Sequence, residues 1–514
     1  MIMRFKTKIL GVATGGVKIV VIHRIDAFNL GVKPGDRIRV FAVKKSDILH
    51  EPGIIAIVDI ATNEQLISPG TIGLYDEIGD KIKEITNSSL VEIRKASHPL
   101  SFAAIKKKIE GKALSTNEII EIVRDCAEEK LLNVELAAFI IGVHIRGLND
   151  DEVVDLTHNF AKSGEIFDFG ANCYDKHSTG GVPGNKISLI IVPILAASGI
   201  FIPKTSTRAI TSPSGTADSM EVLANVIFSK EEVLNILEKE NAGIFWAGAM
   251  NSSPAADGLI EIQKILNIDP LDLMIASILS KKLANGIKKL VLDIPIGAGT
   301  KFPTQEKGRK FAFRFKEIAK RVGIESVCVL TSADQPIGHA VGPALEAREA
   351  LRLLWNPEKG PSSLLNKATD IAGILLEMAG KAPESRGKEL ALEILNSGRA
   401  LRKMQAIIKA QGGNPNINPN EIKVGSFMRE LKADKGGIVA SINNKSINQI
   451  AKIAGCPGDQ KAGIEIEKKI GAKIHPGDVV FRIYANSQAS LNKAVEYYNS
   501  HPPIGLGSMT IEKI

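Results

Sequence analysis

Cysteine, aromatic residues and long apolar runs are all scarce in this sequence of 514 residues. The cysteines stand far apart without a C-x-x-C pair, so neither a disulfide framework nor a metal site is expected; they are Cys126, Cys173, Cys328 and Cys456. The longest apolar stretch, 187–203, is shorter than the ~20 residues that cross a bilayer. Pro193 and Gly199 interrupt it, and it predicts a buried helix. The first residues lack the apolar core of a secretory signal, so we expect a cytoplasmic protein with no membrane partner.

The charge of the chain is basic but dispersed. Lysine and arginine number 65 against 57 acidic residues, which gives a net charge of +8. No basic run is interleaved with aromatic residues, which make up only 5% of the chain, so no nucleic-acid partner is predicted. Anionic small molecules fit this charge equally well. The hydrophobic fraction of 44% predicts a globular protein, and the length predicts roughly two to four domains.

Both ends of the chain are rich in strand patterns. Near the N-terminus, β-branched runs over 17–24, 37–43 and 53–58 are separated by glycine and proline turns, which is typical of a small β-barrel. Near the C-terminus, 437–442 and 478–483 have the same character. We therefore expect a β-barrel-like domain over 1–86 and a smaller α+β domain over 416–514.

The middle of the chain predicts a helical lobe and an α/β lobe. Apolar spacing indicates helices over 117–130, capped by Ser115 or Thr116, and over 136–145, which is apolar on most sides and expected to be buried. In that setting His144 is interpreted as a core residue rather than a ligand. Asn149 to Glu152 forms a capping-box pattern. The helical lobe is predicted to combine 87–165 with 251–287.

Strands and helices alternate in the rest of the middle region. Strand patterns over 201–205, 289–295 and 326–331 are interspersed with helices over 186–197 and 231–239, which argues for a mixed or parallel sheet. Ligand loops then lie at the carboxyl ends of the strands. The fold class is therefore α/β, with this lobe over 166–250 and 288–415.

Two polar loops in the α/β lobe have the composition of a phosphate site. Residues 175–186 and 204–221 each combine hydroxyl groups, glycines and one or two cations. Glycines let backbone N–H groups approach an anion, and a following helix offers its N-terminus. Gly180-Gly181-x-x-Gly184 is neither a dinucleotide fingerprint nor a Walker loop. Two ordinary surface turns are the alternative interpretation.

These loops resemble the thymidine phosphorylase / AMP phosphorylase family. The matching residues are Lys176-His-Ser-Thr-Gly-Gly181 and Ser206-x-Arg-Ala-x(5)-Gly-Thr-x-Asp-x-x-Glu221, and the similarity extends from about residue 90 to the C-terminus. The resemblance implies phosphorolysis, with inorganic phosphate as co-substrate and no other cofactor or metal. It also implies a homodimer or larger homo-oligomer and hinged closure. Phosphate contacts are implied at Lys176, Ser178, Ser188, Ser206 and Thr216; for Ser188 and Ser206, helix or strand capping is the alternative.

The base-binding end decides between members of this family. Ser277 and Lys281 resemble residues that thymidine phosphorylases use at a pyrimidine, but the arginine expected some fifteen positions earlier is missing, since none lies between Arg208 and Arg309. Asp269 instead resembles the proton donor of AMP phosphorylases, although a plain helix cap is the alternative. A carboxylic acid can protonate a purine N7 when burial raises its pKa. The long N-terminal extension is also typical of AMP phosphorylases.

The AMP phosphorylase pattern implies a set of nucleotide contacts. They are Gly181, Thr207, Arg208, Ala209, Ile210, Thr211, Ser212, Thr216, Ser277 and Lys301. Lys281 is added as a substrate contact from the thymidine phosphorylase resemblance, and His177 could contact either sugar or base. Lys301 follows a flexible glycine loop where it could meet a 5′-phosphate, or it is a solvated surface lysine.

The sequence leaves four candidate functions to be compared. The first is AMP phosphorolysis to adenine and ribose 1,5-bisphosphate, with CMP and UMP as further substrates. The second is thymidine phosphorolysis to thymine and 2-deoxyribose 1-phosphate. The third is the chemistry of anthranilate phosphoribosyltransferase-like enzymes, which share the lobe arrangement and would need a diphosphate donor and magnesium. The fourth is a binding module without catalysis, which no sequence feature favours.

Overall fold

The computed structural model describes residues 2–44, 47–48, 53–81, 86–169, 172–209 and 212–507. The chain forms two compact units, Met1–Asn159 with Pro254–Leu273, and Phe160–Ser253 with Met274–Ile514. It passes into the second unit after Asn159, returns at Pro254, and leaves again within helix α11 (Leu271–Ala284). The α/β class predicted from the sequence is confirmed.

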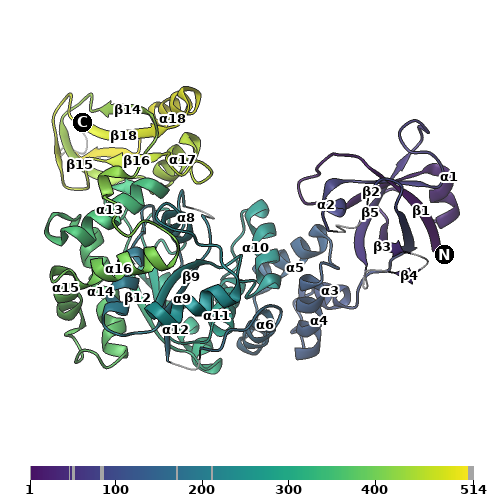
Figure 1. The fold of residues 1–514 in the computed structure, drawn as a ribbon, viewed down its shortest axis with the longest axis horizontal. Helices are drawn as coiled ribbons and strands as arrows, with labels where there is room; N and C mark the ends of the chain where they lie inside the picture. The colour runs from purple at the N-terminus through teal and green to yellow at the C-terminus, as the bar shows by residue number, and fades with distance from the viewer. Residues whose placement is uncertain are drawn as a thin grey trace, which may run out of the picture. The chain divides into compact units, whose positions relative to one another are not determined.

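The first unit begins with a closed β-barrel (Figure 1). Its strands run in the order β3-β5-β2-β6-β1-β7, and β7 pairs again with β3, which closes the sheet. Alternate side chains such as Phe5, Ile22 and Ile38 fill the interior. The strands are β1 (Ile2–Ile9), β2 (Ile19–His23), β3 (Arg37–Lys44), β5 (Ile54–Ala61), β6 (Thr71–Leu74) and β7 (Leu90–Lys95), with the short β4 (Asp47–Ile48) on β3 and helices α1 (Arg24–Leu30) and α2 (Asp76–Gly79) between strands.

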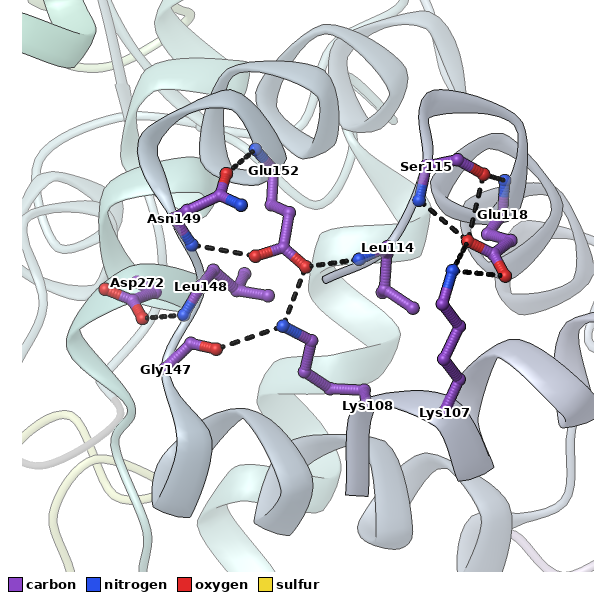
Figure 2. A network of polar contacts seen from close by, with 10 residues as sticks. All are labelled: Lys107, Lys108, Leu114, Ser115, Glu118, Gly147, Leu148, Asn149, Glu152 and Asp272. Atoms are coloured by element: carbon purple, nitrogen blue, oxygen red, sulfur yellow. Dashed lines mark hydrogen bonds and ion pairs between the residues drawn. The ribbon is translucent and has the colours of Figure 1, made fainter. Parts of the chain in front are cut away.

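Helices complete the first unit, and their starts follow the predicted capping patterns. Ser115 caps α4, and Glu118 returns the bond to the Ser115 N–H. Asn149 and Glu152 exchange bonds of 2.7 and 2.9 Å at the start of α6 (Figure 2). The helices are α3 (Ser101–Ile109), α4 (Thr116–Ala127), α5 (Asn133–Arg146), α6 (Asp150–Lys162) and α10 (Pro254–Leu266).

A buried ion pair ties these helices together. Lys108 of α3 lies 2.7 Å from Glu152 of α6 and also donates to the Gly147 carbonyl at 3.2 Å (Figure 2). Glu152 accepts a further bond from the Leu114 N–H at 2.8 Å. Both charged side chains are almost fully buried, and each charge is matched by the other.

Helix α5 departs from the prediction that it is buried between neighbours. Val134 and Ile145 are 71% and 67% exposed, and His144 is exposed as well, so its interpretation as a core residue was wrong. The helix packs against α3 and α10 with one face only, which buries Phe139 and Val143. An apolar sequence does not reveal how many neighbours a helix has, and this explains the error.

The second unit contains parallel strands, as the alternation predicted. β8 (Cys173–Ser178), β11 (Ile287–Ile296) and β12 (Glu325–Ser332) pair in parallel, and β9 (Ile202–Ser206) pairs in parallel with β10 (Ala242–Trp246). The apolar α7 (Ser188–Ala197) is buried against α14 and α16. The remaining helices are α8 (Thr216–Glu221), α9 (Lys230–Glu240), α12 (Gln305–Arg321), α13 (Pro343–Trp355), α14 (Ser362–Met378), α15 (Gly387–Asn396) and α16 (Arg399–Ala410).

The C-terminal part of this unit has two small sheets. Strand β13 (Ala340–Val341), which precedes α13, joins the first of them, so this sheet contains a strand from outside the C-terminal segment. The sheets comprise β14 (Phe427–Lys432), β16 (Gly463–Ile466) and β18 (Val479–Ala485), then β15 (Gly437–Ile442), β17 (Lys473–Ile474) and β19 (Ile504–Gly507), with helices α17 (Asn444–Ala454) and α18 (Gln488–Ser500). In the described ranges, no helix has the length and apolarity needed to span a membrane.

Candidate active site

Both predicted phosphate loops follow parallel strands of the second unit at their carboxyl ends. The first loop continues from β8 and leads into α7, and the second continues from β9 and leads into α8. Loops at these ends of parallel strands form the usual ligand site of an open α/β sheet. Among the predicted residues, Ile210 and Thr211 lie outside the described residues.

Glycines shape the first loop. Gly180, Gly181 and Gly184 all have φ between 72° and 89°, a range that favours glycine. A Cβ on Gly181 would lie 3.2 Å from Thr300 Cα, so the loop after β11, which carries Lys301, packs directly against the first loop. A Cβ on Gly184 would lie 2.6 Å from the Ile337 carbonyl oxygen. Lack of space excludes a larger side chain at Gly184, whereas at Gly180 and Gly181 the positive φ is what favours glycine.

Polar groups in the first loop are only partly satisfied. Ser178 Oγ accepts bonds from Asn185 Nδ2 at 3.1 Å and from the Gly180 N–H at 3.3 Å. Thr179 Oγ1 and Asn185 Oδ1 are buried and have no hydrogen-bond partner among the described residues. Ser188 is buried at the first residue of α7. Buried polar atoms without partners are rare and indicate a place for a water or a ligand.

A group of buried charges lies beside the first loop, and we name it the basic cluster. Asp175 contacts two ammonium groups, with Lys282 Nζ at 2.6 Å and Lys204 Nζ at 3.2 Å. Asp293 Oδ2 lies 3.0 Å from Lys367 Nζ, and its Oδ1 accepts a bond from Thr331 Oγ1 at 2.6 Å. Six buried residues form the cluster: Asp175, Lys176, Lys204, Lys282, Asp293 and Lys367.

The basic cluster holds more positive than negative charge. Four lysines against two aspartates leave an excess of two charges when all are ionised (4 − 2 = +2). Burial raises the pKa of Asp175 and Asp293, but the neighbouring lysines outweigh burial and hold both values below the ordinary range. Burial lowers the pKa of Lys204 to about 7 against the opposing effect of Asp175. An anion would relieve this excess.

Lys176 is the member of the cluster best suited to meet an anion. Its ammonium group forms no hydrogen bond or ion pair within the part of the chain that the structure describes. Burial lowers its pKa to about 8, opposed by the charge of Asp293. The adjacent His177 is half-buried, and desolvation together with Lys282 lowers its pKa well below the usual value. His177 is therefore neutral at pH 7.

The second loop is held by charges of its own. Arg208 forms two bonds with Glu221, of 2.5 and 2.7 Å, and its guanidinium lies 5.0 Å from the Trp246 ring centroid. Asp218 Oδ2 accepts from the Ala209 N–H at 2.7 Å and from Gly215 N–H at 2.8 Å. These contacts fix the loop around the start of α8.

Other predicted contacts of the second loop are placed near its ends. Ser206, Thr207 and Thr216 are half-buried, and Ser206 Oγ donates to the Thr207 carbonyl at 3.1 Å. Ser212 Oγ donates to the Ser214 carbonyl at 2.9 Å. Whether Arg208 also touches a substrate stays a prediction, because both of its Nη atoms already bond acidic side chains.

The residues predicted at the base end fall into both units. Ser277 and Lys281 stand one turn apart on α11, where Lys281 Nζ donates to Ser277 Oγ at 3.3 Å. Lys301 is half-buried, with its Nζ 3.4 Å from Met274 Sδ. Asp269, the predicted proton donor, belongs to the first unit and lies two residues before α11 begins. Its side chain is exposed, so the buried setting expected of a proton donor is not observed at this residue.

The basic cluster is the part of the site that sequence reasoning missed, apart from Lys176. Its members come from β8, β9, β11, α11 and α14, which are far apart along the chain. The available signal was a charged residue at a buried position of a strand: Lys204 follows Ile202 and Pro203, and Asp293 lies between Leu292 and Ile294. Such residues are seldom buried unless they are paired, so they mark functional sites or ion pairs.

Comparison with known proteins now defines the class. The a/b domain of a glycosyl transferase family matches residues 170–401, and the helical bundle domain of the same family matches 103–164. The pyrimidine nucleoside phosphorylase C-terminal domain matches 438–504. Anthranilate phosphoribosyltransferase from Thermus thermophilus shares the fold, with a TM-score of 0.52 and 22% identity over 60% of this chain and 99% of that one.

Relatives that match along the whole chain narrow the class to a family. An AMP phosphorylase of Methanosarcina acetivorans is 45% identical over 96% of both chains. Those of Methanosarcina mazei and Thermococcus kodakarensis are 43% and 42% identical over 100% of this chain and 98% and 99% of theirs. The chain belongs to the thymidine phosphorylase / AMP phosphorylase family, whose resemblance was first apparent in the two loops.

Proposed function

We propose that this protein is an AMP phosphorylase, which cleaves the N-glycosidic bond of AMP with inorganic phosphate to give adenine and ribose 1,5-bisphosphate. CMP and UMP are proposed as further substrates. The observation that carries this proposal is the similarity to proteins of that name along the entire chain, with the N-terminal barrel included. The missing arginine ahead of Ser277 supports it, because a thymidine phosphorylase would use that residue.

The proposed chemistry begins with phosphate in the first loop. The excess positive charge of the basic cluster and the unbonded ammonium of Lys176 favour a dianion there. Ser178, Ser188, Ser206 and Thr216 are proposed to add hydrogen bonds that orient it. A phosphate oxygen then attacks C1′ of the ribose, so no side-chain nucleophile or cofactor is required.

The leaving base takes the electron pair of the glycosidic bond and needs a proton. Asp269 is proposed to deliver that proton to N7 of adenine as the C1′–N9 bond breaks. The 5′-phosphate of the nucleotide is proposed to contact Lys301, while the backbone of the second loop and Gly181 bind the sugar. Ser277 and Lys281 are proposed to contact the base.

The decisive experiment is release of free base from AMP, CMP, UMP, thymidine and uridine, each with and without phosphate and without added metal. Phosphate-dependent release from the nucleotides but not from thymidine is the expected result. Release from thymidine alone would overturn the proposal. A separate assay with diphosphate and magnesium in place of phosphate tests the alternative, and release of base only there would indicate phosphoribosyltransferase chemistry.

Thymidine phosphorolysis is the second candidate because of one contact. Ser277 and Lys281, which resemble the pyrimidine-binding pair, lie 3.3 Å apart on one face of α11. If thymidine is the better substrate, Ser277→Ala should lower turnover of thymidine, whereas Asp269→Asn should leave it unchanged.

We further propose a homodimer that uses the exposed face of α5. Val134, Ile141 and Ile145 are all exposed apolar residues on that helix. Light scattering of the wild-type protein and of Ile145→Lys would check this: the variant should be a monomer at concentrations where the wild type is a dimer. A monomeric wild type would exclude the proposal. Hinged closure also stays a prediction, and an unchanged radius of gyration with both ligands bound would contradict it.

A further inference from the structure

A buried ammonium group lies directly behind the first phosphate loop. Lys186 Nζ donates to the Ile337 carbonyl at 3.0 Å and to the Ala340 carbonyl at 2.9 Å. The Glu349 carboxylate lies 2.6 Å away. An ammonium has three N–H donors, so three oxygens satisfy it completely. The side chain is fully buried, and Glu349 balances its charge.

A second lysine, Lys469, comes from the C-terminal part of the chain and bonds backbone carbonyls next to those that Lys186 binds. Lys469 Nζ donates to the Gly338 carbonyl at 2.8 Å and to the Pro336 carbonyl. The two ammonium groups therefore bind the carbonyl oxygens of residues 336, 337, 338 and 340. Glu349 also accepts a bond from the His339 N–H at 2.8 Å, so the segment 336–340 is fixed from three directions.

This segment is in direct contact with the phosphate loop. The Ile337 N–H donates to the Pro183 carbonyl at 3.0 Å, and Gly184 approaches the Ile337 carbonyl too closely for any Cβ. Asn185, next to Lys186, bonds Ser178 Oγ at 3.1 Å and Asp293 at 3.2 Å. A displacement of Lys186 would therefore be transmitted to Ser178 through one residue.

We propose that Lys186 is a positioning residue for bound phosphate, and that its ammonium serves as an internal cation joining the phosphate loop to residues 336–340. Lys469 extends this connection to the C-terminal domain. The proposal rests on the proposed function. Because Glu349 neutralises Lys186, the effect of Lys186 on phosphate is geometric, which distinguishes it from the unbonded charge of Lys176.

The test replaces Lys186 with methionine, which retains the apolar stem but removes the charge. Misplacement of a binding group by about an ångström can cost up to 10²-fold, and we expect the KM for phosphate to rise at least tenfold while the KM for AMP changes less than threefold. Lys469→Met should raise the phosphate KM by a smaller factor. Lys108→Met is the matched control, since it breaks another buried lysine–glutamate pair but should leave the phosphate KM unchanged.

Chemical rescue adds a readout that general loss of stability would not move. In Lys186→Ala, ammonium or ethylammonium chloride should restore phosphate affinity by occupying the three-oxygen cage, whereas tetramethylammonium chloride at equal ionic strength should not. If Lys186→Met does not fold, the kinetics of Lys469→Met decide, because that variant leaves the Lys186–Glu349 pair in place. Equal changes in both KM values, a similar change in Lys108→Met, or no rescue would overturn the proposal.

Failure of this proposal can be told apart from failure of the proposed function. Phosphate binding to the wild type and to each variant is also measured by calorimetry without any nucleotide. Weaker phosphate binding in Lys186→Met supports the positioning role whichever base the enzyme releases, and unchanged binding contradicts it.

Discussion

The two units each bury charged side chains, but they balance them differently. In the first unit, Lys108 and Glu152 form a one-to-one pair whose remaining bonds go to backbone groups (Figure 2). In the second unit, the basic cluster sets four lysines against two aspartates. A matched pair has little left to offer a ligand, whereas an unmatched group of buried cations is costly until an anion binds. Balance of charge, rather than burial alone, therefore separates structural from functional lysines here.

The largest effect on activity is expected at Asp269, because this residue is proposed to transfer a proton rather than to bind phosphate. Asp269→Asn keeps the shape of the side chain but cannot transfer a proton, so the kcat for AMP should fall on the order of 10²–10⁴-fold. Phosphate binding, measured by calorimetry, should stay unchanged because the cluster is intact. If kcat falls less than threefold, Asp269 is only a helix cap.

The next effect should come from removal of the unbonded charge in the cluster. Lys176→Met is expected to lower kcat/KM for phosphate by about 10²-fold, since an unscreened buried charge facing an anion contributes several kcal/mol. Steady-state kinetics with varied phosphate would measure it. Lys108→Met serves as the comparison and should lose stability but not phosphate affinity. If kcat/KM for phosphate falls equally in the two variants, the matched pair and the basic cluster do not differ in function.

The two units also differ in how much of their charged structure could be predicted from the sequence. The loops 175–186 and 204–221 were recognisable because their residues are contiguous, and the capping patterns at Ser115 and Asn149 are local as well. The basic cluster could not be predicted, because strand pairing brings Asp293 beside Ser178 across more than a hundred residues. A lysine or aspartate within a strand pattern does not reveal its partner.

Helix α5 shows the same limit for apolar residues. Its sequence indicated a helix correctly, but only tertiary packing determines that α3 and α10 cover one face and leave Ile145 exposed. Lys186 is a third case: the sequence placed it beside the phosphate loop, yet its partners Ile337, Ala340 and Glu349 lie more than 150 residues away. Local pattern therefore predicted elements and loops, while long-range partners required the structure.

The free energy of unfolding tests whether the Lys108–Glu152 pair of the first unit is structural only. Glu152→Gln leaves the buried Lys108 without its counter-charge, and loss of one partner of a buried pair costs about 3 kcal/mol or more. Urea denaturation should report that loss, while the KM for phosphate stays within twofold of the wild type. A phosphate KM that rises with the loss of stability would mean that the first unit also shapes the anion site.

The smallest effect concerns pH and follows from the pKa of Lys176. Burial lowers that pKa to about 8, so the protonated form that attracts phosphate predominates below pH 8 and is lost as the pH rises through it. The KM for phosphate, expressed as the concentration of the dianion, should therefore change little from pH 7 to 7.5 and increase several-fold by pH 9. Lys176→Arg supplies the control, because arginine stays protonated throughout this range and its profile should be flat.

An identical rise in both proteins would assign the titration to another group, of which Lys204 is the nearest candidate, since burial lowers its pKa to about 7. Loss of charge at Lys204 would then begin a full pH unit earlier, and the position of the midpoint distinguishes the two lysines.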